Sequence, residues 1–322
     1  MEDAEVERLI GGRPRLAYED IVAHPRLREA ARTYLDRFLA VYDEEPFLVR
    51  LLIEAGRHSV VQLVMMLEAT YEPAKRETWP TLGRVKEMMG AFGFASGRHV
   101  DELIGRLCEV GFLELQPSEH DRRSKILKGT ERLWAHDRQW LAAHFVPLAI
   151  CCPQHDYGPV ERRDPQFQVR FRHATMPFAT LGAKLIRSVP DMLMFFEHAG
   201  GYMVVAALLQ AAFATGDPSH AAVPYTGVAE RFGLSRTHVR RLLGAAEEAG
   251  LVRLHARGGH RVEILPRLWA SHDRGISCGM YFHDMIYVET IKGHALSGSL
   301  SAAEGADAGS RHTGGAHLRR VK

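Results

Sequence analysis

The feature that most constrains the fold of this chain is an internal repeat. The segments 99–115 and 238–254 lie 139 residues apart and are identical at seven of 17 positions. The sequence Arg-Leu-Trp-Ala at 132–135 recurs 135 residues later, and two upstream blocks also recur in the same order. Amphipathic helices can match by chance in one block but hardly in four ordered ones. We therefore predict a tandem duplication, with unit one near residues 13–150 and unit two near 160–292.

Unit two has the residue pattern of a helix-turn-helix over residues 228–249. Ala229 is small enough to let two helices cross closely, and Gly233 can take the left-handed conformation that a tight turn requires. Ser235 is placed to cap the second helix. Apolar residues at three- and four-residue spacing predict the buried face of that helix: Val239, Leu242, Leu243 and Ala246.

A hairpin is predicted directly after this helix. Gly250 ends the helix, and apolar strands at 251–254 and 262–265 flank a glycine-containing tip at 257–261. Helix, turn, helix and hairpin together are typical of a winged helix. A helix of this kind fits the major groove of DNA, and the hairpin tip can reach the backbone or the minor groove.

Unit one repeats this plan less regularly. Its second helix is predicted to start at Ser96 and to end at Gly111, followed by a strand at 112–115 and a wing tip at 119–125. The turn glycine, Gly93, stands one position earlier than in unit two. The predicted buried face of the helix consists of Val100, Leu103, Ile104 and Leu107.

These patterns predict a mainly α fold with small β-hairpin wings. Residues 1–150 hold the winged-helix unit one and N-terminal helices, 151–189 form a linker and an entry helix, and 190–292 hold winged-helix unit two. The segment 293–322 is rich in Gly, Ala and Ser and is predicted to be a disordered tail.

The helix of unit one, the strand after it and the tip Asp121-Arg122-Arg123 resemble the winged-helix domain of the MarR family of bacterial regulators. The chain departs from the family at 128–130, where Lys-Gly-Thr replaces a Leu-Thr helix start. The resemblance implies a helical dimerisation region around the winged helix. With two copies in one chain, it implies a pseudo-dimer. It also allows the core stretches 61–67 and 192–196 to line a pocket for a small-molecule effector.

The two units differ in net charge around the predicted helix and wing. The net charge of +2 excludes a polycation that coats nucleic acid, but residues 230–261 carry seven arginines and three glutamates, a balance of +4. Residues 91–125 carry five basic and six acidic residues, a balance of −1. An outward arginine face beside a basic wing favours contact with duplex DNA in unit two, over the alternative of a merely solvated helix.

The candidate DNA-binding residues follow from this pattern. In unit two they are Arg236, Thr237, His238, Arg240 and Arg241 on the helix, with Arg257, His260 and Arg261 on the wing. In unit one they are Arg98 and His99 on the helix, with Arg122, Arg123 and Lys125 on the wing. The wing residues of unit one are suited to gripping a backbone or a narrow minor groove.

Motifs for enzymatic chemistry are not found in the sequence, and we expect neither an enzyme nor a cofactor. Cys151, Cys152, His155 and Asp156 could be half a zinc site, but no second paired cluster completes it, so no metal site is predicted. The His-Asp-Arg that follows each Arg-Leu-Trp-Ala block is interpreted as a helix-surface charge pattern. Trp134 and Trp269 are interpreted as core anchors.

The apolar stretches fall short of the ~20 residues that span a bilayer, and the acidic start does not resemble a signal peptide. We therefore expect a cytoplasmic protein that does not contact membranes. The expected function is sequence-specific binding of double-stranded DNA by a transcription regulator. A winged-helix module that assembles with other proteins and a plasmid-type replication initiator stay open as alternatives, as does association into a homo-oligomer.

Overall fold

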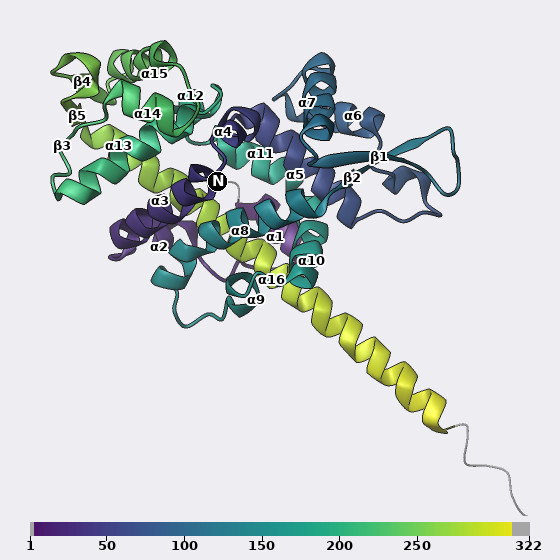
Figure 1. Ribbon diagram of the computed structural model, residues 1–322. Coiled ribbons are helices and arrows are strands. Elements are labelled where there is room, and N and C mark those ends of the chain that lie inside the picture. Colours follow the sequence, from purple (N-terminus) through teal and green to yellow (C-terminus); the bar gives the residue numbers. More distant parts are fainter. Residues whose placement is uncertain (1–2, 311–322) are drawn as a thin grey trace, which may run out of the picture.

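The computed structural model describes the backbone of residues 3–310 and the side chains of residues 6–293. It is mainly helical, with two small antiparallel sheets (Figure 1). The first half contains α1 (Asp3–Ile10), α2 (Tyr18–Val22), α3 (Leu27–Asp43), α4 (Phe47–Leu52), α5 (Ala55–Ala69), the 3-10 turn η1 (Arg76–Thr78), α6 (Leu82–Phe92), α7 (Gly97–Glu109), β1 (Leu113–Pro117), β2 (Lys125–Gly129) and α8 (Glu131–Cys151).

The second half contains α9 (Gly158–Glu161), α10 (Pro165–Thr175), η2 (Met176–Phe178), α11 (Ala179–Arg187), α12 (Pro190–Phe196), α13 (Gly201–Thr215), β3 (His220–Ala221), α14 (Tyr225–Arg231), α15 (Arg236–Glu248), β4 (Val252–Leu254), η3 (Arg257–Gly259), β5 (Val262–Ile264) and α16 (Pro266–Ser310). The same order of elements therefore occurs twice: four helices, a hairpin and a long helix run from α4 to α8 and again from α12 to α16.

One contact of the repeated Arg-Leu-Trp-Ala block also occurs twice. Arg132 donates from Nη1 to the carbonyl of the C-cap residue of α7 at 2.7 Å, and its Nη2 lies 2.6 Å from the carboxylate of Glu45. Arg267 donates to the C-cap carbonyl of α15 at 3.0 Å and forms the corresponding ion pair with Asp191 at 2.6 Å. A helix C-terminus carries partial negative charge, so each arginine stabilises the end of the helix before the hairpin.

The local predictions for the two helix pairs are confirmed. The hydroxyls of Ser96 and Ser235 accept from backbone N–H groups in the first turns of α7 and α15, at 3.3 and 3.1 Å. Gly93 and Gly233 have φ values of 69° and 61°, in the left-handed region that favours glycine. All eight residues predicted to form the two buried helix faces are buried.

The two sheets differ in size. The first consists of β1 and β2 alone, while the second has the strand order β3-β5-β4. The two-residue β3 is too short to give an apolar alternation in the sequence, and it was not predicted. At the equivalent place in the first half, the carbonyl of Pro80 accepts one hydrogen bond from Leu127 of β2 at 2.8 Å without forming a strand.

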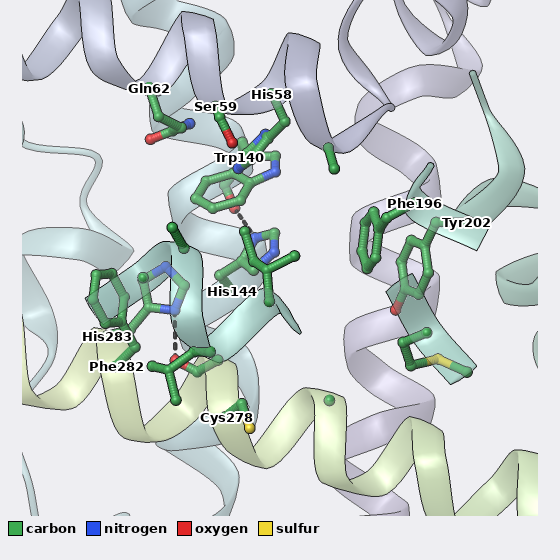
Figure 2. A pocket seen from close by; sticks show the side chains of 18 of the residues that line it. His58, Ser59, Gln62, Trp140, His144, Phe196, Tyr202, Cys278, Phe282 and His283 are labelled. Carbon is green, nitrogen blue, oxygen red and sulfur yellow. Dashed lines mark hydrogen bonds between the residues drawn. The ribbon is translucent and has the colours of Figure 1, made fainter. Parts of the chain in front are cut away.

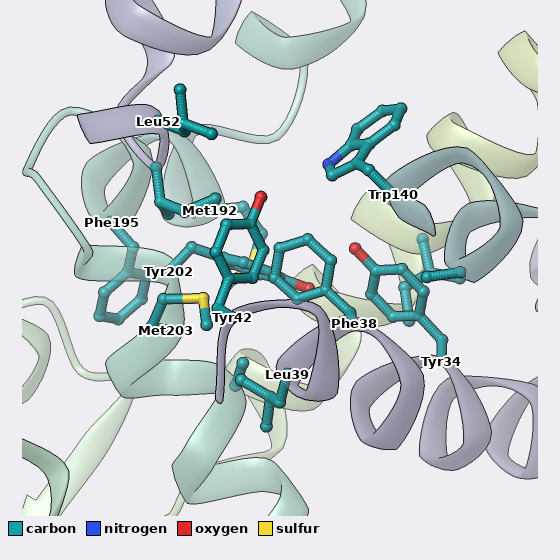
Figure 3. Close-up of a cluster of buried hydrophobic side chains, with 14 of the residues drawn as sticks. Tyr34, Phe38, Leu39, Tyr42, Leu52, Trp140, Met192, Phe195, Tyr202 and Met203 are labelled. Carbon is teal, nitrogen blue, oxygen red and sulfur yellow. The ribbon is translucent and has the colours of Figure 1, made fainter. Parts of the chain in front are cut away.

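Both halves share one core, because α3 packs against α8, α13 and α16. Figure 3 shows the aromatic side chains of α3 facing both halves. Phe38 meets Tyr202 of α13 edge-on, with ring centroids 5.5 Å apart, and Tyr34 hydrogen-bonds to His144 of α8 at 3.1 Å. Of the two predicted core tryptophans, Trp269 is buried, while Trp134 is half-buried against the core.

Residues 151–189 do more than link the halves. They form α9, α10, η2 and α11, and α10 packs against both α5 and α16. Phe167 and Phe171 of α10 are almost completely buried. The prediction for this segment was a linker with one entry helix, whereas α9, α10 and α11 all lie in it.

The predicted tail also differs from the structure. α16 continues through Ser310, so residues 293–310 are helical rather than disordered, and residues 311–322 lie outside the described part of the chain. No proline interrupts the sequence between Arg267 and Ser310, and the alanines in this stretch favour helix.

The interpretation of the His-Asp-Arg motifs as surface patterns was wrong. Asp137 is 2% exposed and His272 is 1% exposed. The motifs lie on α8 and α16, which other helices cover on several sides. A polar residue on such a helix is buried with partners of its own, and helical periodicity alone does not identify those partners.

Candidate nucleic-acid interface and interior cavity

The outward face of α15 carries unpaired cations. Arg236, Thr237, Arg240 and Arg241 are all exposed. None of the three arginines forms an ion pair with any residue whose side chain the structure describes. The capped N-terminus of α15 adds partial positive charge beside Arg236. This helix therefore presents a positive surface whose arginines are not paired with any carboxylate in the described part of the chain.

The corresponding face of α7 is neutralised. Arg98 lies 2.9 Å from the carboxylate of Glu102, one turn along the helix, and Arg106 lies 2.7 Å from that of Glu109. All four side chains are more than half exposed, so each ion pair contributes little stability. Their effect is on charge: an approaching phosphate meets carboxylates as well as guanidinium groups.

The candidate histidines of the two helices face the protein. His238 Nε2 lies 3.0 Å from the carbonyl oxygen of Ala199, and burial lowers the pKa of His238. His99 Nε2 lies 3.7 Å from the carboxylate of Glu54, at the equivalent place before α5. Both rings are half-buried, and His238 contacts the backbone just before α13, while Nε2 of His99 has no hydrogen-bond partner among the described residues. Both residues are candidate DNA-binding residues, and the structure places their rings in half-buried rather than exposed positions.

The hairpin β1–β2, the predicted wing of unit one, projects from the molecule (Figure 1). Arg122, Arg123 and Lys125 are exposed at its tip. Asp121 accepts from the backbone N–H of Arg123 at 3.0 Å and from the hydroxyl of Ser124 at 2.8 Å. These hydrogen bonds lower the pKa of Asp121. The aspartate thus shapes the turn, and the arginine side chains stay available.

The hairpin β4–β5, the predicted wing of unit two, has shorter strands and is held to the segment just before α14. The carbonyl of Gly259 accepts from the N–H of Val223 at 2.8 Å, and a Cβ on Gly259 would lie 2.2 Å from the carbonyl oxygen of Val223. Only glycine fits this close approach. The candidate residues Arg257, His260 and Arg261 are exposed on this tip.

A cavity of about 270 Å³ lies where the two halves meet (Figure 2). Its walls come mainly from α3, α5 and α8 of the first half and from α10, α11, α12, α13 and α16. The stretches 61–67 and 192–196, considered as pocket walls, contribute Gln62, Met66, Met192 and Phe196. The lining is mostly apolar and aromatic, as in sites for small organic ligands.

Several histidines line this cavity and are held neutral. The ring of His144 stacks on Trp140 at 3.6 Å between centroids. Burial lowers the pKa of His58 and His283 to about 4, and that of His272 to about 3. Nδ1 of His272 is buried without a hydrogen-bond partner among the described residues. A bound ligand with one polar group could satisfy it.

These histidines predict acid sensitivity. Histidine has a pKa of about 6.5 in an unfolded chain, so below pH 6.5 the unfolded state takes up protons that the folded state does not. The free energy of unfolding should fall by about 1.4 kcal/mol per pH unit for each buried histidine, until the pH reaches the folded pKa. We expect His58→Phe to reduce this slope by about 1.4 kcal/mol per pH unit, which is the contribution of one buried histidine. The slope is measured by urea unfolding between pH 6.5 and 4.5. The exposed His120→Phe is the matched control, and equal slopes in both variants would contradict the assignment.

The cysteine group considered as half a zinc site does not form one in the described residues. Cys151 and Cys152 are buried free cysteines, and burial raises the pKa of both thiols. A different set of potential ligands comes together on the second sheet: His220, His255 and Glu263. The sequence gives little signal for this set, because the three residues are spread over 44 positions.

No protein-family model, curated protein or solved structure matches the chain. Within the described residues, no single helix is long and apolar enough to cross a membrane. Only α12 and α13 taken together reach the length and apolar composition of a membrane span, and the two helices are bent by 116° against each other.

Proposed function

We propose that the protein is a transcription regulator that binds specific sequences of duplex DNA through two unequal winged helix-turn-helix units. The helix α15 is the principal reading element. The observation that carries the proposal is its exposed face of Arg236, Arg240 and Arg241, which no described carboxylate neutralises. Arginine in this setting can donate two hydrogen bonds to guanine in the major groove.

The placement of the two units supports a pseudo-dimer. In Figure 1, α7 and α15 lie along the same edge of the molecule, and the two hairpins lie at opposite flanks. A dimeric helix-turn-helix protein presents its two reading helices in this way, to half-sites about 34 Å apart. A single chain of this form, which resembles a MarR dimer, would bind an asymmetric site, because α7 offers a neutralised face and α15 a positive one.

The interior cavity supports a role for a small-molecule effector. It lies between the units, so a ligand there would contact α5 and α8 of one half and α16 of the other. If the units can adopt two relative placements, a ligand that binds one placement more tightly increases the population of that placement. An organic molecule with an aromatic or aliphatic body and one hydrogen-bonding group fits this lining.

The proposal is tested by selecting from a random duplex library with the full chain, followed by footprinting. We expect one enriched motif that is better defined in one half-site, and an affinity that falls steeply with salt concentration. An unenriched library with binding insensitive to salt would overturn the proposal and favour the protein-assembly alternative. Binding that melts the duplex beside the motif would favour a replication initiator.

The wings are predicted to hold the backbone rather than to read bases. We expect Arg122→Ala, Arg123→Ala and Arg261→Ala each to weaken binding to specific and random duplexes by similar factors. Each lost phosphate contact should flatten the plot of log affinity against log salt by roughly one unit. Fluorescence anisotropy at several salt concentrations measures both effects. An unchanged slope in all three variants would mean that the wings do not touch DNA.

A further inference from the structure

The second sheet brings three metal-ligating side chains to one place. His220 lies on β3 and Glu263 on β5, and the two residues are direct partners in the antiparallel register. His255 follows the last residue of β4, which is also paired with β5. Directly opposed residues in antiparallel strands project to the same face of a sheet, which explains why residues so far apart in sequence meet here.

The potential ligand atoms lie close enough for one ion. One ligand atom from each of the three residues lies within 4.8 Å of the other two. His255 Nε2 is 2.6 Å from Glu263 Oε2. Zinc binds imidazole nitrogen and carboxylate oxygen at about 2.0–2.2 Å, so ligand atoms around it are about 3.4 Å apart. Small side-chain rotations would bring the three atoms to that spacing.

A neighbouring carboxylate and the exposure of the ligands both favour a cation at this place. The carboxylate of Asp217 lies 3.6 Å from Nδ1 of His220, where it adds negative charge and can orient the ring. The side chains of His220, His255 and Glu263 are 34%, 38% and 23% exposed, so an ion can enter from solvent without unfolding the sheet.

A neighbouring arginine opposes the ion. Arg253 Nη1 lies 2.9 Å from Glu263 Oε2 and occupies part of the space on that carboxylate. The Arg253 side chain is 59% exposed, so it can swing into solvent at little cost. Removing this arginine should therefore strengthen metal binding, which provides a specific test of the site.

We propose that His220, His255 and Glu263 form a binding site for a divalent transition-metal ion of the zinc class, with water completing the coordination. Two imidazoles and one carboxylate suit zinc among the common divalent ions, whereas magnesium and calcium prefer all-oxygen sites. The ion would join β3 to β5 and to the end of β4 that leads into the hairpin tip. The site does not depend on the proposed DNA binding.

The test is a titration of the full chain, without a histidine tag, with zinc chloride in competition with a chromogenic chelator. We expect one zinc ion bound by the wild type and at least a tenfold loss of affinity in His255→Ala and in Glu263→Gln. His260→Ala, an exposed histidine on the same wing, should bind as the wild type does. Arg253→Ala should bind more tightly.

Cobalt gives a second readout that does not depend on affinity. Cobalt added to the wild type should produce visible absorption bands of a low-coordinate site, and His220→Ala/His255→Ala should not produce them while keeping the helical circular dichroism of the wild type. Zinc binding of equal affinity and stoichiometry in the wild type and in this folded double variant would overturn the proposal. So would weaker binding in Arg253→Ala.

Discussion

The double substitution Arg236→Ala/Arg240→Ala is expected to abolish sequence-specific binding to duplex DNA. Each arginine that makes a good bidentate base contact contributes about 1–3 kcal/mol, so losing two reduces affinity for the selected site to the level of random duplex. Both residues lie on the exposed face of α15 and neither is paired with a described carboxylate, so the substitution should leave folding intact.

The matched control is Arg98→Ala/Arg106→Ala on α7. It removes the same number of charges from the equivalent helix, but both arginines are already paired with carboxylates of that helix. We expect a loss of less than tenfold, measured by anisotropy with the selected duplex and a scrambled one. Comparable losses in the two double variants would show that unit one reads DNA as fully as unit two does.

Local features of the fold could be predicted because they depend on neighbouring residues. The cap at Ser235, the left-handed Gly233 and the buried face of α15 each follow from residue types within one or two helical turns. The exposed arginines of the same helix follow from the same periodicity. Charge counting also anticipated the contrast between α7 and α15.

Long-range features could not be predicted in this way. The half-buried positions of His99 and His238 depend on the residues just before α5 and α13, two helices earlier in the chain. The burial of Asp137 depends on α10, whose contacting side chains lie 31 and 35 residues away in the sequence. The cavity and the cluster around Glu263 likewise join residues from several elements. Periodicity identifies which face of a helix is buried, but it does not identify the elements that cover it.

The largest stability effect is expected at the ion pair between Asp137 of α8 and Arg172 of α10. Both side chains are nearly inaccessible, at 2% and 3% exposure. Arg172 Nε donates to Asp137 Oδ2 at 3.0 Å, and the amide of Gln168 donates to the same oxygen at 2.6 Å. Asp137→Ala would leave the guanidinium buried without its acceptor and the Gln168 amide with the carbonyl of Trp134 alone. Breaking a buried pair in this way costs about 3–5 kcal/mol, to be measured as the free energy of unfolding in urea.

Two further variants distinguish the loss of the Asp137–Arg172 ion pair from a general effect of substitution in α8. Glu131→Ala removes a carboxylate of the same helix that is 79% exposed and paired with Arg138, and should cost less than about 1 kcal/mol. Asp137→Leu/Arg172→Met replaces both charges by apolar groups and should recover most of the loss. Arg172 also lies over the Trp140 ring at 5.7 Å on the cavity wall, so the recovered variant should fold but bind cavity ligands differently. A loss in Asp137→Ala no larger than that in Glu131→Ala would mean that the pair does not hold α10 to the core.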